Sequence, residues 1–254
     1  APTVQIGGSV AANETPETRS YVYTLVTDLG EEGPPSAASA TIDVTSTGTV
    51  TVNMPANNNP SGNYFFSGAA KKRVYRSNTG SNFTDFQFVS EVAYASTSFT
   101  DNIASSALGE VLPSGTWIGP PDDDTSLYPD GPMLGLTAVG NGVFAGFSGK
   151  RFCLSEPFLP HAWPIAYRIT LEEDIIDIAA TGNGVVALTN GTPYFITGTD
   201  PAALTPVRVD LAQACVNKNS VVDMGEYVLY AAPDGLVAVG GPSGEVVSRG
   251  LISV

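Results

Sequence analysis

The sequence predicts an all-β protein. Only 14% of its 254 residues are charged, while Gly (27) and Pro (19) are plentiful. This composition is typical of short strands joined by tight turns. No stretch of useful length carries the 3.6-residue apolar period of an amphipathic helix. A chain of this length can hold one large or two ordinary β domains.

The first half predicts a β-sandwich. Residues 19–28 alternate, so that Tyr21, Tyr23 and Leu25 face one way and the residues between them the other. Residues 29–36 then combine Gly and Pro in turn chemistry. Regular short strands separated by loops rich in Asn, Gly and Pro, such as 56–62, are typical of a sandwich. The further strands are expected at 40–44, 48–54, 72–76, 87–92 and 97–100.

Several of these segments resemble a fibronectin type III domain. Residues 21–36 are similar to the last two strands of that family, 73–77 to its third strand and 98–101 to its fifth. The pieces that normally close the domain therefore come first. This order implies a permuted sandwich, in which the hairpin at 19–40 pairs with strands from 71–101. The alternative is two incomplete half-domains, each completed by chain outside this sequence.

The second half contains a repeat of about 42 residues. Residues 140–147 begin with Gly-Asn-Gly and an apolar run, and the pattern recurs at 182–189, which gives a period of 182 − 140 = 42. A looser third copy covers 225–240, its leading Gly 43 residues beyond that of the second copy (225 − 182). Each copy is preceded by a strand of its own, expected at 134–139, 175–180 and 220–224.

Repeated antiparallel units with Asn-Gly or Asp-Gly turns predict blades of a β-propeller. Three such units do not close a ring, so further blades are expected beyond Val254. The chain starts at Ala1, and 250–254 reads as a strand cut short, which indicates a segment of a longer polypeptide. The alternative is a meandering sheet or a small sandwich. The predicted domains are a sandwich over 1–118, a linker over 119–133 and propeller-like repeats over 134–254.

The charge of the chain disfavours nucleic acids and anionic membranes as partners held by charge. The chain has 11 basic and 25 acidic residues, which gives a formal net charge of −14. The only local basic cluster is 71–73. No apolar run approaches the roughly 18 residues of a membrane span, and the first residues carry no signal-peptide pattern.

Few residues are candidates for catalysis. The only histidine, His161, lies among prolines, and a structural hydrogen-bonding role is preferred over that of a general base. Cys153 and Cys215 are expected to be buried and reduced rather than linked. A zinc site would need carboxylates beside these few His and Cys ligands. Gly140-Asn141-Gly142 is a hairpin turn without a following helix, so it is not a phosphate loop.

Two acidic runs are candidate cation sites. The residues 122–124, with Asp130, could bind calcium but lack the spacing of a known calcium loop, so a solvated linker is preferred. The run 172–174 is expected to be an exposed turn. The sequence therefore predicts no catalytic, cofactor-binding or metal-binding residue, and a protein that is not an enzyme.

A rigid loop adds a second resemblance. Residues 155–164 hold three prolines, with Phe158 and Trp163 among them. With the hairpin repeats and the sandwich, this loop is similar to virion structural proteins of tailed bacteriophages. The nearest group is the tail nozzle or tail-tube protein of short-tailed phages, which carries β-propeller regions.

This resemblance implies a structural component of a phage tail that helps to form the DNA exit channel. Its partners would be copies of itself in a ring and neighbouring adaptor and fibre proteins. Its place would be the virion, assembled in the host cytoplasm. An acidic lumen would let DNA pass without sequence-specific binding.

Two other functions are alternatives to a structural role. A tail-tip or cell-surface adhesin that binds carbohydrate would need a row of exposed aromatic rings, and the only tryptophans are Trp117 and Trp163, both near prolines. A secreted propeller enzyme is disfavoured by the lack of a signal peptide and of catalytic groups.

Overall fold

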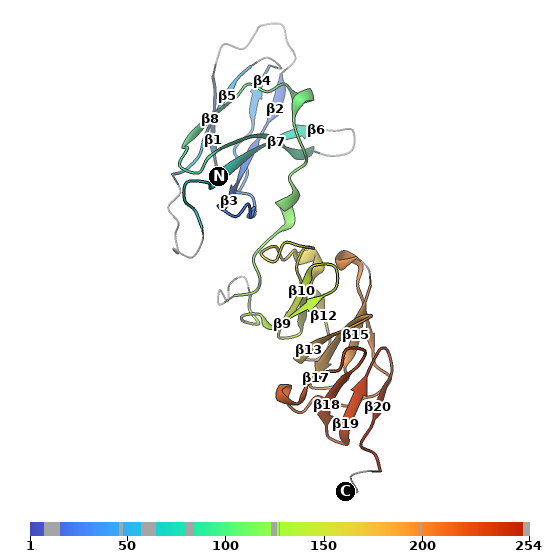
Figure 1. Ribbon diagram of the computed structural model, residues 1–254. Coiled ribbons are helices and arrows are strands. Elements are labelled where there is room, and N and C mark those ends of the chain that lie inside the picture. Colours follow the sequence, from blue (N-terminus) through green and yellow to red (C-terminus); the bar gives the residue numbers. More distant parts are fainter. Residues whose placement is uncertain are drawn as a thin grey trace. The chain divides into compact units, whose positions relative to one another are not determined.

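The chain folds into two compact units, 1–117 and 118–254 (Figure 1). The computed structural model describes residues 1–7, 16–45, 48–56, 65–79, 84–122, 126, 128–198 and 200–250. Most of the 56–62 loop, Asp123, Asp124 and the last residues, 251–254, lie outside the described part. The described residues of the segment predicted as a linker, 119–133, belong to the second unit. At its start, the carbonyl of Ile118 accepts from the amide of Trp163 at 2.9 Å.

The all-β prediction is confirmed. The described strands form six antiparallel sheets, and the only helical segments among them are short 3-10 turns. The elements of the first unit are β1 (Thr3–Ile6), β2 (Glu17–Arg19), β3 (Tyr21–Val26), β4 (Ile42–Val44), β5 (Val50–Asn53), β6 (Lys71–Thr79), β7 (Thr84–Ala93), β8 (Ser98–Asp101), η1 (Ser105–Ala107) and η2 (Pro113–Thr116).

In the first unit, β3 pairs antiparallel with β6, which pairs with β7. This confirms the prediction that the 19–40 segment pairs with strands from 71–101. After β3 the chain turns at Gly30, whose φ of 82° lies in the left-handed region that favours glycine. It then runs back along β3, where the amides of Gly33, Ser36 and Ser39 donate to β3 carbonyls.

The core of the first unit lies between the sheet β3-β6-β7 and the sheet β1-β5-β8. Tyr21 and Val74 from the first sheet pack against Val50 and Val52 from the second. The core also holds a buried carboxylate, Asp101, which accepts hydrogen bonds from the Tyr21 hydroxyl at 2.7 Å and from Arg76 Nη1 at 2.6 Å. These side chains are wholly buried, so the charges of Asp101 and Arg76 are neutralised by each other away from water.

The second unit holds three four-stranded sheets, each a meander in chain order. The sequence predicted the first three strands of each sheet and missed the fourth. The elements are β9 (Leu134–Val139), β10 (Val143–Ser148), β11 (Arg151–Leu154), η3 (Ile165–Tyr167), β12 (Ile169–Thr170), β13 (Ile175–Thr181), β14 (Gly184–Thr189), β15 (Tyr194–Thr197), η4 (Pro201–Ala203), β16 (Thr205–Arg208), η5 (Lys218–Ser220), β17 (Val222–Asp223), β18 (Val228–Ala232), β19 (Gly235–Val239) and β20 (Gly244–Val246).

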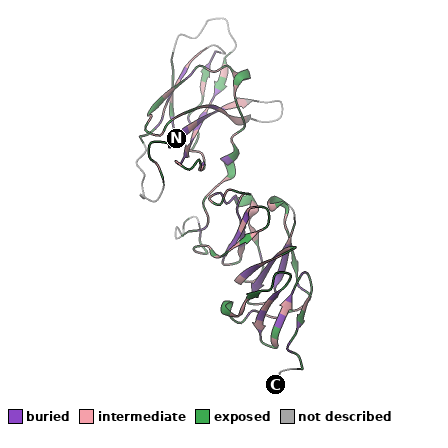
Figure 2. Cartoon of the chain, in the orientation of Figure 1, coloured by how far each residue is buried: buried purple, intermediate pink, exposed green. Residues whose placement is uncertain are grey.

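The three sheets stack face to face, with the sheet β13–β16 in the middle. Alternate residues of β14 point to its two sides: Val185 and Ala187 pack on the first sheet, and Val186 and Leu188 on the third. All four side chains are buried. Figure 2 shows buried residues along the strands of this unit. The near-continuous apolar run of β14 is the pattern expected of a strand covered on both faces.

The first repeat is out of phase with the other two by one residue. Val143 and Val185 hold the same place in the sequence repeat, yet Val143 points forward to the next sheet and Val185 back to the previous one. The turns explain this difference. In the second sheet two residues separate the paired Thr181 and Gly184, whereas three separate the paired Val139 and Val143. One extra residue in a turn reverses the faces of the strand that follows.

Candidate assembly surface

No residue in the described part of the chain covers one face of the third sheet. We call this the open face, the side of the sheet β17–β20 that points away from the middle sheet. Val222, Leu236 and Val247 on it are 49%, 45% and 41% exposed. Strand register places the following residues on this face: Val222, Leu229, Ala231, Leu236, Ala238, Glu245 and Val247. Six of the seven are apolar.

The corresponding face of the middle sheet is covered by another sheet. Leu229 and Ala238 form a pair in the third sheet in the same way as Val186 and Phe195 in the middle sheet. The middle-sheet pair is buried beneath the third sheet. The open face therefore repeats a surface that, one sheet earlier, is covered by a sheet of the same kind.

The other end of the stack is partly capped. On the face of the first sheet that points away from the middle sheet, Ser148 Oγ donates to the carbonyl of Gly131 at 2.7 Å, and Arg151 pairs with Asp130 at 3.1 Å. A Cβ on Gly146 would collide with Met133. Segment 128–133 thus covers this face, while Leu134 and Leu136 at its β9 edge stay exposed.

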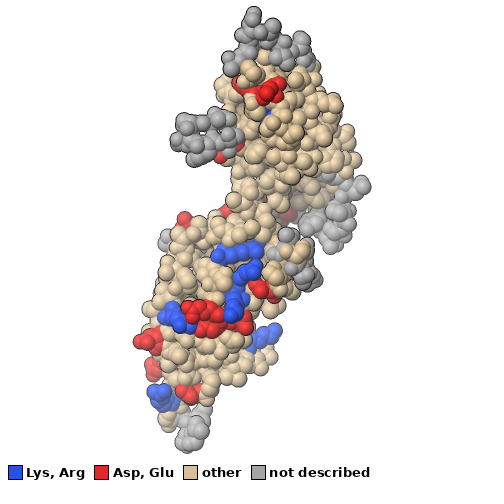
Figure 3. Space-filling view, turned by 180° about the vertical axis from the view of Figure 1, so that it is seen from behind, with Lys and Arg blue, Asp and Glu red and all other residues tan. Residues whose placement is uncertain are grey.

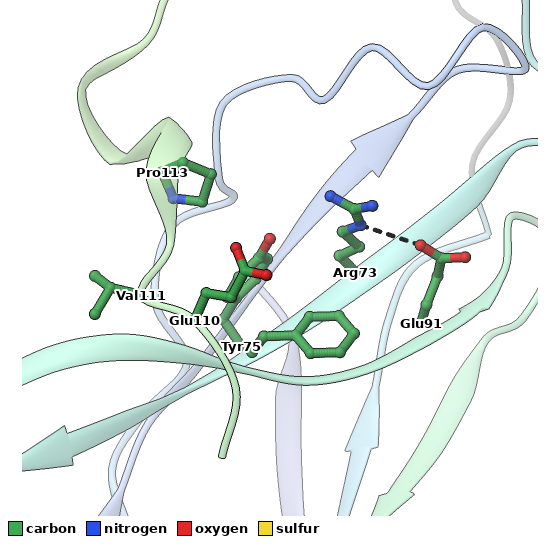
Figure 4. Close-up of a pocket in the computed structure, with 7 residues that line it drawn as sticks. Arg73, Tyr75, Glu91, Glu110, Val111 and Pro113 are labelled. Atoms are coloured by element: carbon green, nitrogen blue, oxygen red, sulfur yellow. Dashed lines mark hydrogen bonds and ion pairs between the residues drawn. The ribbon is translucent and has the colours of Figure 1, made fainter.

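A pocket of about 180 Å³ lies on the outer face of the sheet β3-β6-β7 in the first unit (Figure 4). Arg73 and Glu91 stand on one side of it, and Val111 and Pro113 on the other. Strands β6 and β7 supply most of its floor, and residues 109–112 run along β7 as the second wall. The lining residues are Arg73, Tyr75, Phe88, Glu91, Glu110, Val111 and Pro113.

A buried carboxylate underlies this pocket. Glu32 is only 6% exposed and accepts from the Tyr75 hydroxyl at 2.6 Å and from Arg73 Nη1 at 2.8 Å. Burial, and then the hydrogen bond to Glu32, raise the pKa of Tyr75 well above its ordinary value. Tyr75 therefore stays a neutral donor, and Arg73 is held between Glu32 and Glu91, which its Nε contacts at 3.0 Å.

A second cavity, of about 220 Å³, lies at the turn end of the first two sheets. The turns 140–142 and 182–184 form its rim, and apolar side chains such as Val139, Leu154 and Leu204 line it. Its lining offers no ionisable side chain, so it has no group for acid–base chemistry.

The candidate catalytic residues of the sequence lie apart from the pockets. His161 is half-buried in a loop beside Trp163. Trp163 is 2% exposed, and its indole Nε1 donates to the carbonyl of Pro160 at 2.9 Å. Cys153 and Cys215 are free and buried, as expected. Burial raises the pKa of Cys153 to about 11, and burial also raises the pKa of Cys215.

The acidic runs do not form a metal site within the described ranges. No group of three His, Cys, Asp or Glu side chains there could hold an ion. Asp130 pairs with Arg151, and the run 172–174 is more than an exposed turn: Glu173 is half-buried, pairs with Arg208 and accepts from the Tyr194 hydroxyl. Figure 3 shows basic and acidic side chains next to one another on this unit.

Two residues of the basic cluster 71–73 are bound within the first unit: Lys72 is buried, and Arg73 is paired with carboxylates. Lys72 is wholly buried, and its Nζ donates to the carbonyls of Pro55 at 3.0 Å and Ser96 at 2.7 Å. Burial lowers the pKa of Lys72. No helix in the described residues is both long and apolar enough to cross a membrane.

Comparisons with known proteins give little support for a family. No protein-family model matches the chain, and no curated protein matches it. A solved structure that resembles it is described as a candidate 6-phosphogluconolactonase from Bacteroides uniformis. The TM-score is 0.33 at 9% identity, over 86% of this chain and 78% of the other.

This comparison contradicts one prediction. The sequence predicted a protein that is not an enzyme, whereas the structure found is described as an enzyme. The exclusion of enzymes is therefore withdrawn. At this TM-score the likeness carries no argument for any particular activity.

Proposed function

We propose that this chain is a structural component of a phage tail, which acts by assembling through the open face into a ring around the DNA exit channel. The observation that carries the assembly is the row of uncovered apolar side chains on the third sheet, Leu236 and Val247 among them. Exposed apolar surface of this kind is typical of interaction sites. The virion setting rests on the sequence resemblance.

Two further features support assembly. The middle sheet is packed on both faces, and the open face presents matching apolar side chains that no described residue covers. The strand β16 is exposed along its whole length at the sheet edge, so its backbone groups can pair with another chain. Cyclic rings form when such contacts repeat between copies around one axis.

The test compares the self-association of the purified chain with that of a variant that carries introduced charges on the open face. Light scattering after size exclusion should show concentration-dependent association of the unaltered chain. The double variant Leu236→Glu, Val247→Glu should be monomeric, because carboxylates would lose water on contact. Leu29→Glu in the first unit is the matched control, since Leu29 is 69% exposed and lies off this surface.

The virion setting needs a separate measurement. Mass spectrometry of purified tailed particles should detect the protein, and electron microscopy should place it in a symmetric ring. A protein that stays monomeric at all concentrations and is absent from particles would refute the proposal.

A further inference from the structure

We propose that the pocket of the first unit binds a lysine or arginine side chain of a partner protein. The pocket is the space enclosed by Arg73, Tyr75, Glu91, Glu110 and Pro113, with Phe88 and Val111 completing its walls (Figure 4). This inference goes beyond assembly through the open face and does not depend on it.

The size of the pocket selects one side chain. Its volume of about 180 Å³ is below the roughly 300 Å³ at which pockets for whole small molecules begin. One part of the wall is apolar, formed by Phe88, Val111 and Pro113. Such a wall suits the methylene stem of a long side chain, which packs on apolar groups while its charged end reaches polar ones.

The charge of the pocket selects a cation. Arg73 is the only basic residue of the lining, and it is already paired with Glu91 at 3.0 Å and with Glu32 at 2.8 Å. Glu110 adds a third carboxylate, and its side chain makes no hydrogen bond or ion pair with any described residue, although its backbone carbonyl accepts from the amide of Phe88. Three carboxylates against one guanidinium leave a net negative site, and Glu110 is the group free to bind a new ammonium or guanidinium.

The walls are held in place before any ligand arrives. The amides of Gly109 and Leu112 donate to the carbonyls of Phe88 and Phe86 at 2.8 and 2.7 Å, which ties the Glu110 segment to β7. Tyr75 and Phe88 pack edge to face with ring centroids 5.8 Å apart. A pocket that is already formed loses little conformational freedom on binding.

The experiment is a two-dimensional amide NMR titration of the full chain with N-acetyl-lysine methylamide and its arginine counterpart. The amides of Phe88, Glu110 and Val111 should shift and saturate. N-acetyl-norleucine methylamide, which has the stem but no charge, should cause no shift there. The variant Glu110→Gln should weaken binding about five- to tenfold, because the amide oxygen can still accept a hydrogen bond but the bond is no longer strengthened by the charge of the carboxylate. Glu226→Gln, an exposed change in the second unit that lies off the open face, should not alter binding.

Several outcomes would overturn the proposal. Equal shifts with the norleucine probe would make the site merely apolar, and shifts with N-acetyl-glutamate methylamide instead would make it an anion site on Arg73. No shift with any probe, or unchanged affinity in a Glu110→Gln variant whose spectrum shows a native fold, would also refute it. The open face would be unaffected by each of these results.

Discussion

The hydroxyl of Tyr21 donates a 2.7 Å hydrogen bond to Asp101, a carboxylate 80 residues later in the chain. The bond joins β3 to β8, which belong to different sheets of the first unit. Arg76 of β6 completes the contact from the other side of the same carboxylate oxygen. Three strands thus meet at one buried charge.

Removing that charge should destabilise the first unit strongly. In Asp101→Asn the side chain keeps its shape, but Arg76 loses its anion while remaining buried. The free energy of unfolding should fall by about 3–5 kcal/mol. Tyr21→Phe removes only one hydrogen bond and should cost about 1–3 kcal/mol. Urea unfolding followed by circular dichroism measures both, and an unchanged midpoint for Asp101→Asn would contradict the role of the network.

The stacking of the sheets predicts a contrast between two leucines. Leu188 of the middle sheet is fully buried against the third sheet, whereas Leu236 on the open face is 45% exposed. Leu188→Ala should lower the free energy of unfolding by about 2–5 kcal/mol, and Leu236→Ala by less than about 0.5 kcal/mol. Thermal or urea unfolding at low protein concentration, where the chain is monomeric, tests this. Similar losses at both positions would mean that the open face is covered within the monomer.

Stability should fall at high pH. Burial is the first cause of the raised pKa values of Tyr21 and Tyr230, so the folded state favours their neutral forms. A group with a raised folded pKa stabilises the fold fully below its unfolded pKa, about 10 for tyrosine, and less as pH rises above it. Lys72 has the opposite sign, because burial lowers its pKa and deprotonation removes a penalty.

The alkaline loss should exceed the gain from Lys72, because several tyrosines share the same sign. The free energy of unfolding, measured in urea from pH 8 to 11, should decline above about pH 10. Tyr230→Phe, which removes the hydroxyl bonded to the carbonyl of Gln213, should make the decline shallower. A stability that rises throughout this range would show that Lys72 dominates.

The two thiols should resist modification in the folded protein. Cys153 and Cys215 are buried, and burial raises the pKa of Cys153 to about 11, so little thiolate is present at pH 8. Iodoacetamide at pH 8 should label both sites rapidly only after denaturation, as read by mass spectrometry. Rapid labelling of the native chain at either site, or a disulfide between the two in samples prepared without reductant, would contradict the observed burial.

Much of the fold could be predicted because the signals are local. Alternation in β3 and the repeated glycine turns identify strands and hairpins within short windows. The outer strands were missed for a local reason as well: β12 has two residues, and β16 is exposed throughout, without alternation. Their positions are set by pairing with β11 and β15.

The pocket could not be predicted from the sequence. Glu32, Arg73 and Glu110 are separated by about 40 residues each. They come together only because β3 pairs with β6, β6 pairs with β7, and the 109–112 segment runs along β7. Lys72 shows the same limit, because its neighbours in the sequence are charged while its position in the sheet is fully buried. The burial of a side chain depends on the face of its strand and on the segment that covers it.

The three-residue turn at 140–142 also limits how these repeats could be exchanged by recombination. The two-residue turn of the second repeat would place the residues of β10 on the opposite sides if it were grafted alone between β9 and β10. Phe144 would then face inward and Ala145 outward. Each turn must therefore be exchanged together with the strand that follows it. A recombination that separated the two would place the apolar residues of that strand on the solvent side of the sheet.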